Sequence, residues 1–349
     1  MRSLRLLIGA LALGLVVTGP AEAKDSFKIA WSMYVGWMPW GWAADHGIVR
    51  KWADKYGIEI EVVQINDYVE SINQYTAGGF DGCAMTNMDA LTIPAVGGID
   101  STALIVGDFS NGNDGIVSKA AKSVAELQGQ SLNLVELSVS HYLLARALEQ
   151  SGLSEKDVTV VNTSDADIVS VFTGTEDVRH VVTWNPLLSE VAAIPGATEL
   201  FNSSQVPGEI IDLMVLNTTT LEANPAFGKA LVGAWYETLS IMRATDTSGI
   251  DARTAMAQAS ATDLAGFDAQ LKTTRMFWDA KEAVEFTDSP KLVETMDHVR
   301  NFSNSKGLMG GDMDTVGTAF PGGKALGKAG GIKLRFSDAY MRMAAEGAL

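Results

Sequence analysis

A run of aromatic side chains near the start of the chain has the composition of a ligand-binding wall. Residues 31–42 read WSMYVGWMPWGW, and Gly36 interrupts regular structure within the run. Flat aromatic faces stack on planar groups and attract cations, at about 0.5–2 kcal/mol per contact. We therefore expect Trp31, Tyr34 and Trp37 to line a pocket for a small planar or cationic molecule.

Acidic side chains recur in segments that follow apolar runs. Asp89 lies in TNMDA, Asp108 and Asp114 lie in GDFSNGNDGIV, and Glu136 directly follows SLNLV. Each acid alone is explained by a helix cap or a solvated turn. Carboxylates gathered at one edge of a sheet would instead cancel the positive ends of the helices there and favour a cation. We expect Asp89, Asp114 and Glu136 to contact such a ligand.

The sequence contains no recognisable catalytic or metal-binding constellation. It has no GxSxG, no Walker A motif and no GxGxxG after an expected strand, so we expect no catalytic residues and no cofactor. The four histidines stand far apart and Cys83 is the single cysteine, which argues against a bound metal. With 26 Lys and Arg against 42 Asp and Glu, the formal net charge is −16, which disfavours nucleic acid as a partner.

Short apolar runs alternate with helical segments along most of the chain. Strands are expected at 27–31, 58–65, 80–85, 101–106, 131–135, 158–162, 178–184 and 210–216, and mainly helices from 225 onward. The alternation restarts after Val117, so it predicts two α/β lobes, each a mostly parallel sheet flanked by helices. Ligands of such sheets lie beyond the carboxyl ends of the strands, where the aromatic and acidic segments fall.

The first 23 residues have the composition of a secretory signal peptide. Arg2 and Arg5 precede an apolar run from Leu6 to Val17, and the sequence AEA at 21–23 has the small-x-small pattern that signal peptidase cleaves. The apolar run is shorter than the ~20 residues that span a membrane. We expect a mature chain that begins at Lys24 and is exported.

Several motifs, taken in order, resemble one family. The segments GWMPW, GGFDGCAMTNMDAL, SVAELQGQSLNLVELSVSHYLLARALEQSGLSEKDVTVV and VVTWNPLLSEV resemble the periplasmic solute-binding proteins of ABC importers for nitrate, taurine and sulfonates. The segments YVGWMPWGW, TNMDALTIPA and SNGNDGIV resemble more closely the subgroup associated with urea carboxylase gene clusters, which are devoted to guanidine or urea.

The resemblance implies a two-lobe periplasmic binding protein-like fold of type II with a helical C-terminal extension. Lobe 1 is expected to comprise residues 24–117 and 215–349, and lobe 2 residues 118–214, with a hinge where the chain crosses near Val117 and Leu216. The implied partners are a small-molecule ligand and an ABC transporter permease in the inner membrane. The implied state is a periplasmic monomer without enzymatic activity.

The same resemblance assigns ligand-facing roles to further residues. Ser140 and His141 correspond to the ligand-facing helix start of lobe 2, and Trp184 and Asn185 to a turn of the form W-x-P. Asp114 corresponds to an acid that meets the amine of the ligand in taurine-type relatives.

The acids in these loops depart from the pattern of the sulfonate and nitrate relatives. Those relatives carry Ser, Thr, Lys or Arg there, whereas this chain carries Asp89, Asp114 and Glu136. The departure favours a nitrogen-rich cation, and guanidinium is the first expectation. Urea, taurine or an alkyl sulfonate is the alternative ligand, and an exported enzyme of similar fold is the alternative class.

Overall fold

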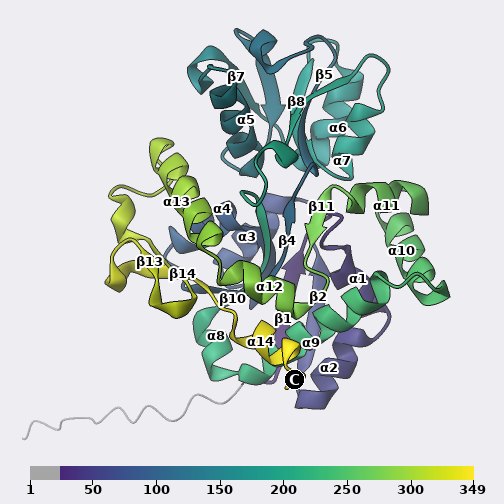
Figure 1. Cartoon of the computed structure of the whole chain (residues 1–349), viewed down its shortest axis with the longest axis vertical. Coiled ribbons are helices and arrows are strands. Elements are labelled where there is room, and N and C mark those ends of the chain that lie inside the picture. The colour runs from purple at the N-terminus through teal and green to yellow at the C-terminus, as the bar shows by residue number, and fades with distance from the viewer. Residues whose placement is uncertain (1–23) are drawn as a thin grey trace, which may run out of the picture.

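Two β-sheets flanked by helices make up residues 24–349, the part of the chain that the computed structural model describes (Figure 1). The expected signal peptide at 1–23 lies outside these described residues. In Figure 1 the smaller sheet, with β5, β7 and β8, lies above the larger one. Within residues 24–349, no helix is long and apolar enough to cross a membrane.

The larger sheet is built from both ends of the chain. Its strands follow the order β13-β12-β14-β4-β10-β3-β1-β2, and β11 pairs with β4 beside this path. The bounds along that order are β13 (Ala325–Leu326), β12 (Gly317–Ala319), β14 (Ile332–Phe336), β4 (Ser101–Ser110), β10 (Ile211–Asn217), β3 (Gly82–Thr86), β1 (Ser26–Trp31), β2 (Glu59–Gln64) and β11 (Thr274–Met276).

The smaller sheet comes from the middle of the chain. Its strand order is β7-β6-β8-β5-β9, and β9 is a strand that the hydrophobic pattern does not predict. The bounds along that order are β7 (Thr159–Asn162), β6 (Ser131–Leu134), β8 (His180–Trp184), β5 (Asp114–Ser118) and β9 (Thr198–Asn202).

Both sheets are mixed, which makes them less parallel than the alternation predicts. β1 is parallel to β2 and β3, and β6 is parallel to β7 and β8, as βα units require. By contrast, β10 is antiparallel to both of its neighbours in the larger sheet, and β5 is antiparallel to both of its neighbours in the smaller one. Each of these two strands begins after the chain has crossed from the other sheet, so the crossing sets its reversed direction.

The two sheets are connected by two short segments. Residues 111–113 join β4 to β5, and residues 203–210 join β9 to β10. Both segments come before the crossings expected near Val117 and Leu216. The first comes early because β5 already joins the smaller sheet at Asp114, where it pairs with β8. The segment GDFSNGNDGIV, whose polarity indicates a loop, is therefore mostly strand.

Helices cover the sheets and form most of the C-terminal part. Those between the strands are α1 (Met38–Asp45), α2 (Ile48–Tyr56), α3 (Tyr68–Thr76), α4 (Asn87–Ala90), α5 (Val139–Gln150), α6 (Asp165–Gly174) and α7 (Leu187–Ala192). Those that follow β10 are α8 (Thr218–Ala223), α9 (Pro225–Met242), α10 (Thr247–Ala259), α11 (Leu264–Leu271), α12 (Ala280–Thr287), α13 (Pro290–Ser305) and α14 (Ala339–Ala345).

Local sequence explains where the first helices begin and end. Gly47 separates α1 from α2, with a φ of 73° that glycine adopts without strain. Asp67 caps α3, because its carboxylate accepts a hydrogen bond from the backbone N–H of Glu70 at 2.9 Å. Both features follow from local residue types, and the cap at Asp67 fixes the position of Tyr68 at the start of α3.

The C-terminal extension is helical, as expected, and it also contributes strands. β11, β12, β13 and β14 all join the larger sheet, although the Gly-rich segment 310–333 indicates a loop. α13 reaches the smaller sheet's layer as well. The ring of Phe302 lies 5.2 Å from that of Tyr142 in α5, and Lys306 forms an ion pair with Glu155. The extension therefore contacts both layers of the molecule.

Candidate ligand-binding site

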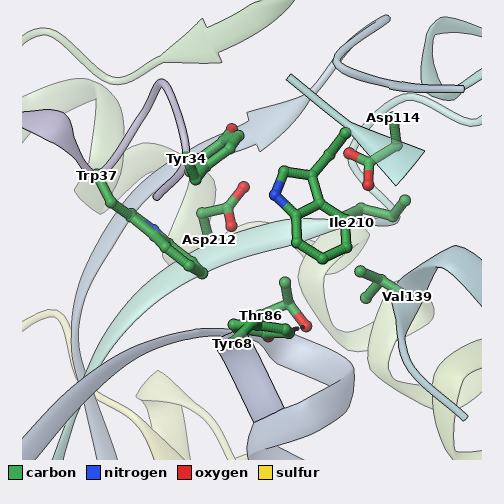
Figure 2. A pocket seen from close by; sticks show the side chains of 9 residues that line it. Tyr34, Trp37, Tyr68, Thr86, Asp114, Val139, Ile210 and Asp212 are labelled. Atoms are coloured by element: carbon green, nitrogen blue, oxygen red, sulfur yellow. Dashed lines mark hydrogen bonds between the residues drawn. The ribbon is translucent and has the colours of Figure 1, made fainter. Parts of the chain in front are cut away.

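A pocket lies where the two sheets meet, and both sheets contribute to its lining (Figure 2). The pocket is narrow, since the whole space between its walls, open solvent at its mouth included, is about 300 Å³. In Figure 2, Trp37 and Tyr34 lie at one end of this space and Asp114 and Val139 at the other. The full lining consists of Tyr34, Trp37, Tyr68, Thr86, Asp114, Val139, Trp184, Ile210 and Asp212.

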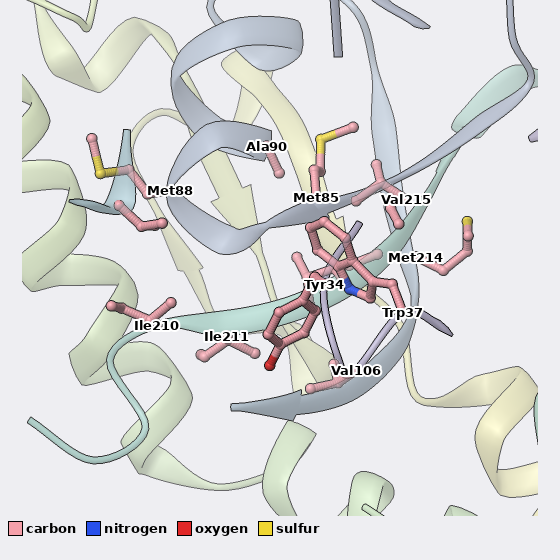
Figure 3. Packing of buried hydrophobic residues seen from close by; sticks show 14 of the residues in the cluster. Tyr34, Trp37, Met85, Met88, Ala90, Val106, Ile210, Ile211, Met214 and Val215 are labelled. Carbon is pink, nitrogen blue, oxygen red and sulfur yellow. The ribbon is translucent and has the colours of Figure 1, made fainter. Parts of the chain in front are cut away.

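Four aromatic rings form a connected wall around the pocket. The ring centroids of Tyr34 and Trp37 are 5.0 Å apart, those of Trp37 and Tyr68 are 5.7 Å apart, and those of Tyr68 and Trp184 are 5.8 Å apart. Tyr34 and Trp37 also belong to the main hydrophobic cluster, together with Met85, which holds their rings in place (Figure 3). The wall therefore offers preorganised flat surfaces to a ligand.

The two tyrosines of the wall orient carboxylates through their hydroxyl groups. Tyr34 donates to Asp108 Oδ1 at 2.7 Å, and Tyr68 donates to Asp89 Oδ2 at 2.7 Å. The hydroxyl of Thr86 also donates to Asp89 Oδ2, at 2.8 Å. Asp89 and Asp108 consequently lie directly behind the lining residues rather than in the lining itself.

The remaining two acids, Asp114 and Asp212, line the pocket directly. Asp114 is the first residue of β5, and its Oδ2 accepts a hydrogen bond from the hydroxyl of Ser110. Asp212 lies in β10, in the larger sheet. Carboxylates from both sheets thus face the same small space.

Burial raises the pKa of all four carboxyl groups. The pKa of Asp89 and that of Asp114 rise to about 6, although hydroxyl donors oppose the rise. Burial also raises the pKa of Asp108 and Asp212, and negative charge on nearby carboxyls adds to this effect. The cause is a concentration of acidic groups in a poorly solvated space that has no basic residue in its lining.

The composition of the pocket decides what it can hold. Among its lining residues the only ionisable side chains besides the tyrosines are two aspartates. Across residues 24–349, no group of three or more His, Cys, Asp or Glu has a geometry that could hold a metal ion. A sulfonate or nitrate would face carboxylates without a cationic or arginine partner. The site is therefore suited to a small organic molecule that donates hydrogen bonds and tolerates or carries positive charge.

Part of the residue set expected from the sequence comes together here. Tyr34, Trp37, Asp114 and Trp184 line the pocket, and Asp89 lies behind it through its bonds to Tyr68 and Thr86.

Trp31 and Glu136 do not reach the pocket, which corrects two expectations. Trp31 is 3% exposed, and its ring packs on Gly41 of α1, where a Cβ atom would lie 2.5 Å from Trp31 Cζ2. It is a core residue because β1 directs it under this helix. Glu136 is exposed to solvent beyond the end of β6, and only its backbone N–H is anchored, to Asn162.

The expected ligand-facing helix start of the smaller sheet contributes Val139 instead of its polar neighbours. Ser140 is fully buried and outside the lining. His141 Nδ1 accepts a hydrogen bond from the backbone N–H of Leu137, and its Nε2 pairs with Glu155. Both ring nitrogens are thus committed to structural contacts, so the expectation for His141 is wrong.

Asn185 also has a structural role rather than a place in the lining. Its Oδ1 accepts from the backbone N–H of Ser189 at 3.0 Å, and its Nδ2 donates to Thr273 Oγ1 at 3.2 Å. It therefore fixes the start of α7 and ties it to the segment before β11.

Several lining residues were not expected from the sequence: Tyr68, Thr86, Val139, Ile210 and Asp212. A signal existed for Asp212, which is the lone charge in the apolar run IIDLMVL. A carboxylate inside a buried strand needs a partner or a function. Tyr68 and Thr86 carry no comparable signal, because only the packing of α3 against β3 brings them together.

Two mixed sheets joined by two crossings, with a pocket between them, define a periplasmic binding protein-like fold. The chain belongs to the NMT1/THI5-like family, whose sequence pattern matches residues 48–245. Proteins from Brucella abortus and Brucella suis that carry the provisional name of binding proteins are 23% identical to it over 201 residues. The match covers 57% of this chain and 62% of theirs, so it spans less than two thirds of those relatives.

Solved structures with the same fold are named for anionic ligands. The alkanesulfonate-binding protein of Xanthomonas axonopodis pv. citri, bound to MOPS, has a TM-score of 0.68 at 16% identity, and the match covers 82% of this chain and 95% of that one. The nitrate-binding protein of Synechocystis has a TM-score of 0.62 at 12% identity, with 93% and 89% covered. At these identities the likeness establishes the fold alone.

Proposed function

We propose that the chain is the solute-binding protein of an ABC importer and that it captures a small organic cation, guanidinium, between its two sheets. The observation that carries the ligand proposal is the pairing of acids from both sheets with an aromatic wall. Asp114 and Asp212 face the pocket, and Asp89 and Asp108 stand behind it. No lining residue is basic.

Guanidinium matches this chemistry in shape and in hydrogen bonding. It is planar, it is charged at neutral pH, and its nitrogens only donate hydrogen bonds, like the head group of arginine. Carboxylates accept such donors in pairs, and aromatic rings attract the charged face. Taurine and alkyl sulfonates fit less well, because their sulfonate oxygens would lie against Asp114 and Asp212.

Urea is the second candidate, and the raised carboxyl pKa values favour it. Burial raises the pKa of Asp114 to about 6, so a protonated fraction exists in mildly acidic solution. A protonated carboxyl can donate a hydrogen bond to the oxygen of urea, which a carboxylate would repel. Urea has nearly the same shape as guanidinium, so charge is the property that separates the two candidates.

The importer role rests on the fold and on the names of the relatives. A binding protein of this class would deliver its ligand to a permease in the inner membrane, as a periplasmic monomer released from its signal peptide. The expected chemistry is capture without turnover. Recovery of chemically altered ligand after incubation with the purified protein would instead favour the alternative of an exported enzyme.

Calorimetric titration at pH 7.5 with a panel of small solutes tests the ligand. The panel contains guanidinium, urea, tetramethylammonium, taurine and nitrate, so that charge and hydrogen-bond donation vary separately. A charge-assisted hydrogen bond contributes about 1.5–3 kcal/mol, so guanidinium should bind at least about tenfold more tightly than urea. Tetramethylammonium should bind weakly, because it has charge without donors. Equal affinity for urea, or preference for taurine or nitrate, would overturn the cation proposal.

A further inference from the structure

Two carboxyl groups beside the pocket occupy opposite positions on neighbouring strands. Asp212 in β10 pairs in register with Asp108 in the antiparallel strand β4. The Asp108 side chain is fully buried and Asp212 is 4% exposed. Side chains directly opposite each other in such a pair are in contact, and two like charges there destabilise the sheet. Burial raises the pKa of both carboxyl groups, and the negative charge of Asp108 raises the pKa of Asp212 further, so a proton on one of the two relieves the repulsion.

The surroundings of the pair supply no positive charge. Tyr34 donates to Asp108 Oδ1, and Asp114 faces the pair from β5 with its own negative charge. Asp89, on α4, adds negative charge next to Asp114. On the other side of β4, β11 carries Arg275, but its guanidinium bonds the backbone oxygen of Met276 and the carboxylate of Glu282.

Asp108 has no room for another partner on the side away from the pocket. Within the described residues, no protein group donates a hydrogen bond to its buried Oδ2. A Cβ atom at Gly36 would lie 2.7 Å from this oxygen. Among the described residues, no basic side chain compensates the second negative charge of the pair, and a proton on the pair itself can do so.

We propose that Asp108 and Asp212 share one proton in the empty protein and release it when an organic cation enters, so that the site exchanges a proton for its ligand. The proposal rests on the cationic ligand proposed above. The O–H bond of the pair breaks, the proton passes to water or buffer, and no other covalent bond changes. The ligand brings one positive charge as the proton removes one, so the net charge of the pocket is conserved.

This exchange makes the pair a determinant of charge specificity. A cation gains the attraction of two carboxylates in place of one carboxylate and one acid. A neutral molecule of the same shape leaves the proton on the pair, because a second negative charge would not attract it. Affinity for the cation should therefore rise about tenfold per pH unit where the pair is protonated and level off above that range, whereas affinity for urea should not rise with pH.

The test is calorimetric titration of guanidinium chloride into the whole mature protein in two buffers of different ionisation enthalpy, such as phosphate and Tris, over several pH values. The difference in heat between the buffers counts the protons released. The expected result is about one proton per guanidinium in the wild type. In Asp108→Asn the amide can donate to Asp212 without a titrating proton, so above about pH 7, where Asp89 and Asp114 are already ionised, release should fall close to zero and the pH dependence should flatten. Glu136→Gln, an exposed acid outside the site, serves as the matched control and should behave as the wild type.

The outcomes separate this inference from the proposed function. Guanidinium binding without proton release would overturn the exchange and leave the cationic ligand in place. Absence of guanidinium binding to the wild type would overturn both. An infrared spectrum of the ligand-free wild type gives a second measurement that needs no variant to fold. A carbonyl band of a protonated carboxyl is expected near neutral pH, and its absence would overturn the shared proton.

Discussion

The indole nitrogen of Trp184 lies 3.4 Å from the backbone oxygen of Met33, a hydrogen bond that joins the end of β8 to the loop after β1. The ring of Trp184 lies 5.8 Å from that of Tyr68 on the opposite layer. One wall of the pocket therefore comes from the smaller sheet and is fastened to the larger sheet across the ligand space.

Trp184→Phe should keep the aromatic wall and remove this fastening. We expect ligand dissociation to accelerate by roughly two- to tenfold, because one neutral hydrogen bond contributes about 0.5–1.5 kcal/mol. Stopped-flow displacement measures the rate.

Small-angle scattering of the wild type should show a smaller radius of gyration with saturating ligand, as expected for two layers that close on each other. An unchanged profile, with binding shown separately, would contradict closure.

Asp114→Asn should discriminate between charged and neutral ligands. The substitution keeps the shape of the side chain and its contact with Ser110 but removes the negative charge. We expect the Kd for guanidinium to rise about tenfold or more and the Kd for urea to change by less than about threefold. Calorimetry measures both, with Glu136→Gln as the control. Unaltered guanidinium affinity in Asp114→Asn would show that this carboxylate does not bind the ligand.

The ligand-free protein should lose stability as the pH rises from 5 to 7.5. The folded-state pKa values of Asp89 and Asp114 are raised to about 6, above the value near 3.9 of an unfolded chain. The folded state therefore holds protons that the unfolded state has released. The associated stability is complete at low pH and is lost as the pH passes through the folded-state pKa, at about 1.4 kcal/mol per pH unit for each proton.

Thermal unfolding of the empty protein across this pH range measures the effect. The Tm should fall with rising pH, and Asp108→Asn should reduce the fall because it removes one of the raised carboxyls. Saturating guanidinium should also reduce the fall in Tm with rising pH, since the ligand replaces the lost protons as a source of positive charge. A Tm that increases steadily from pH 5 to pH 7.5 would contradict the raised pKa values.

His141→Ala should lower the stability of the fold and leave the affinity for the ligand unchanged. The ring of His141 is buried and bonded to Leu137 and Glu155, away from the pocket lining. We expect the free energy of unfolding to fall by about 1–3 kcal/mol, because buried polar partners are left unsatisfied. Chemical denaturation measures this loss. The Kd for ligand should stay within about threefold of the wild type, and a larger change would restore His141 to the binding site.

Export should remove the first 23 residues. Arg2, Arg5 and the apolar run that follows predict a signal peptide, and AEA at 21–23 predicts the cleavage point. Mass spectrometry of protein from the periplasmic fraction should find an N-terminus at Lys24. Recovery of the chain with Met1 intact from the cytoplasm would contradict export.

The alternation of strands and helices was predictable because each βα unit is a local pattern. The cap at Asp67, the break at Gly47 and the restart of the pattern after Val117 follow from a few neighbouring residues. The exact crossings and β9 were not predictable, since the crossings depend on how far β4 pairs with β10 and β11, and β9 forms by pairing with β5. All of these pairings join residues that are far apart in the sequence.

The site was predictable where one segment supplies its own chemistry. The aromatic run after β1 identifies Tyr34 and Trp37 by composition alone. His141 illustrates the opposite case, because its role is decided by Glu155 and by the end of α13, which no local pattern connects to it. Asp212 was missed because the strand that carries it is otherwise apolar, although that contrast is itself a usable signal.

The two connecting segments place charges on opposite sides of the joint between the layers. Asp114 is the first residue after one crossing, and Asp212 is the second residue of the strand after the other. Near neutral pH Asp114 is ionised and the Asp108–Asp212 pair keeps one negative charge in the empty protein, so the two sides repel, and salt screens buried charges only weakly. This repulsion between carboxylates favours separation of the two halves in the empty protein. If the ligand is the cation proposed above, it acts as a counter-ion to both halves at once, and we expect the groups that recognise it also to favour the closed form of the loaded protein.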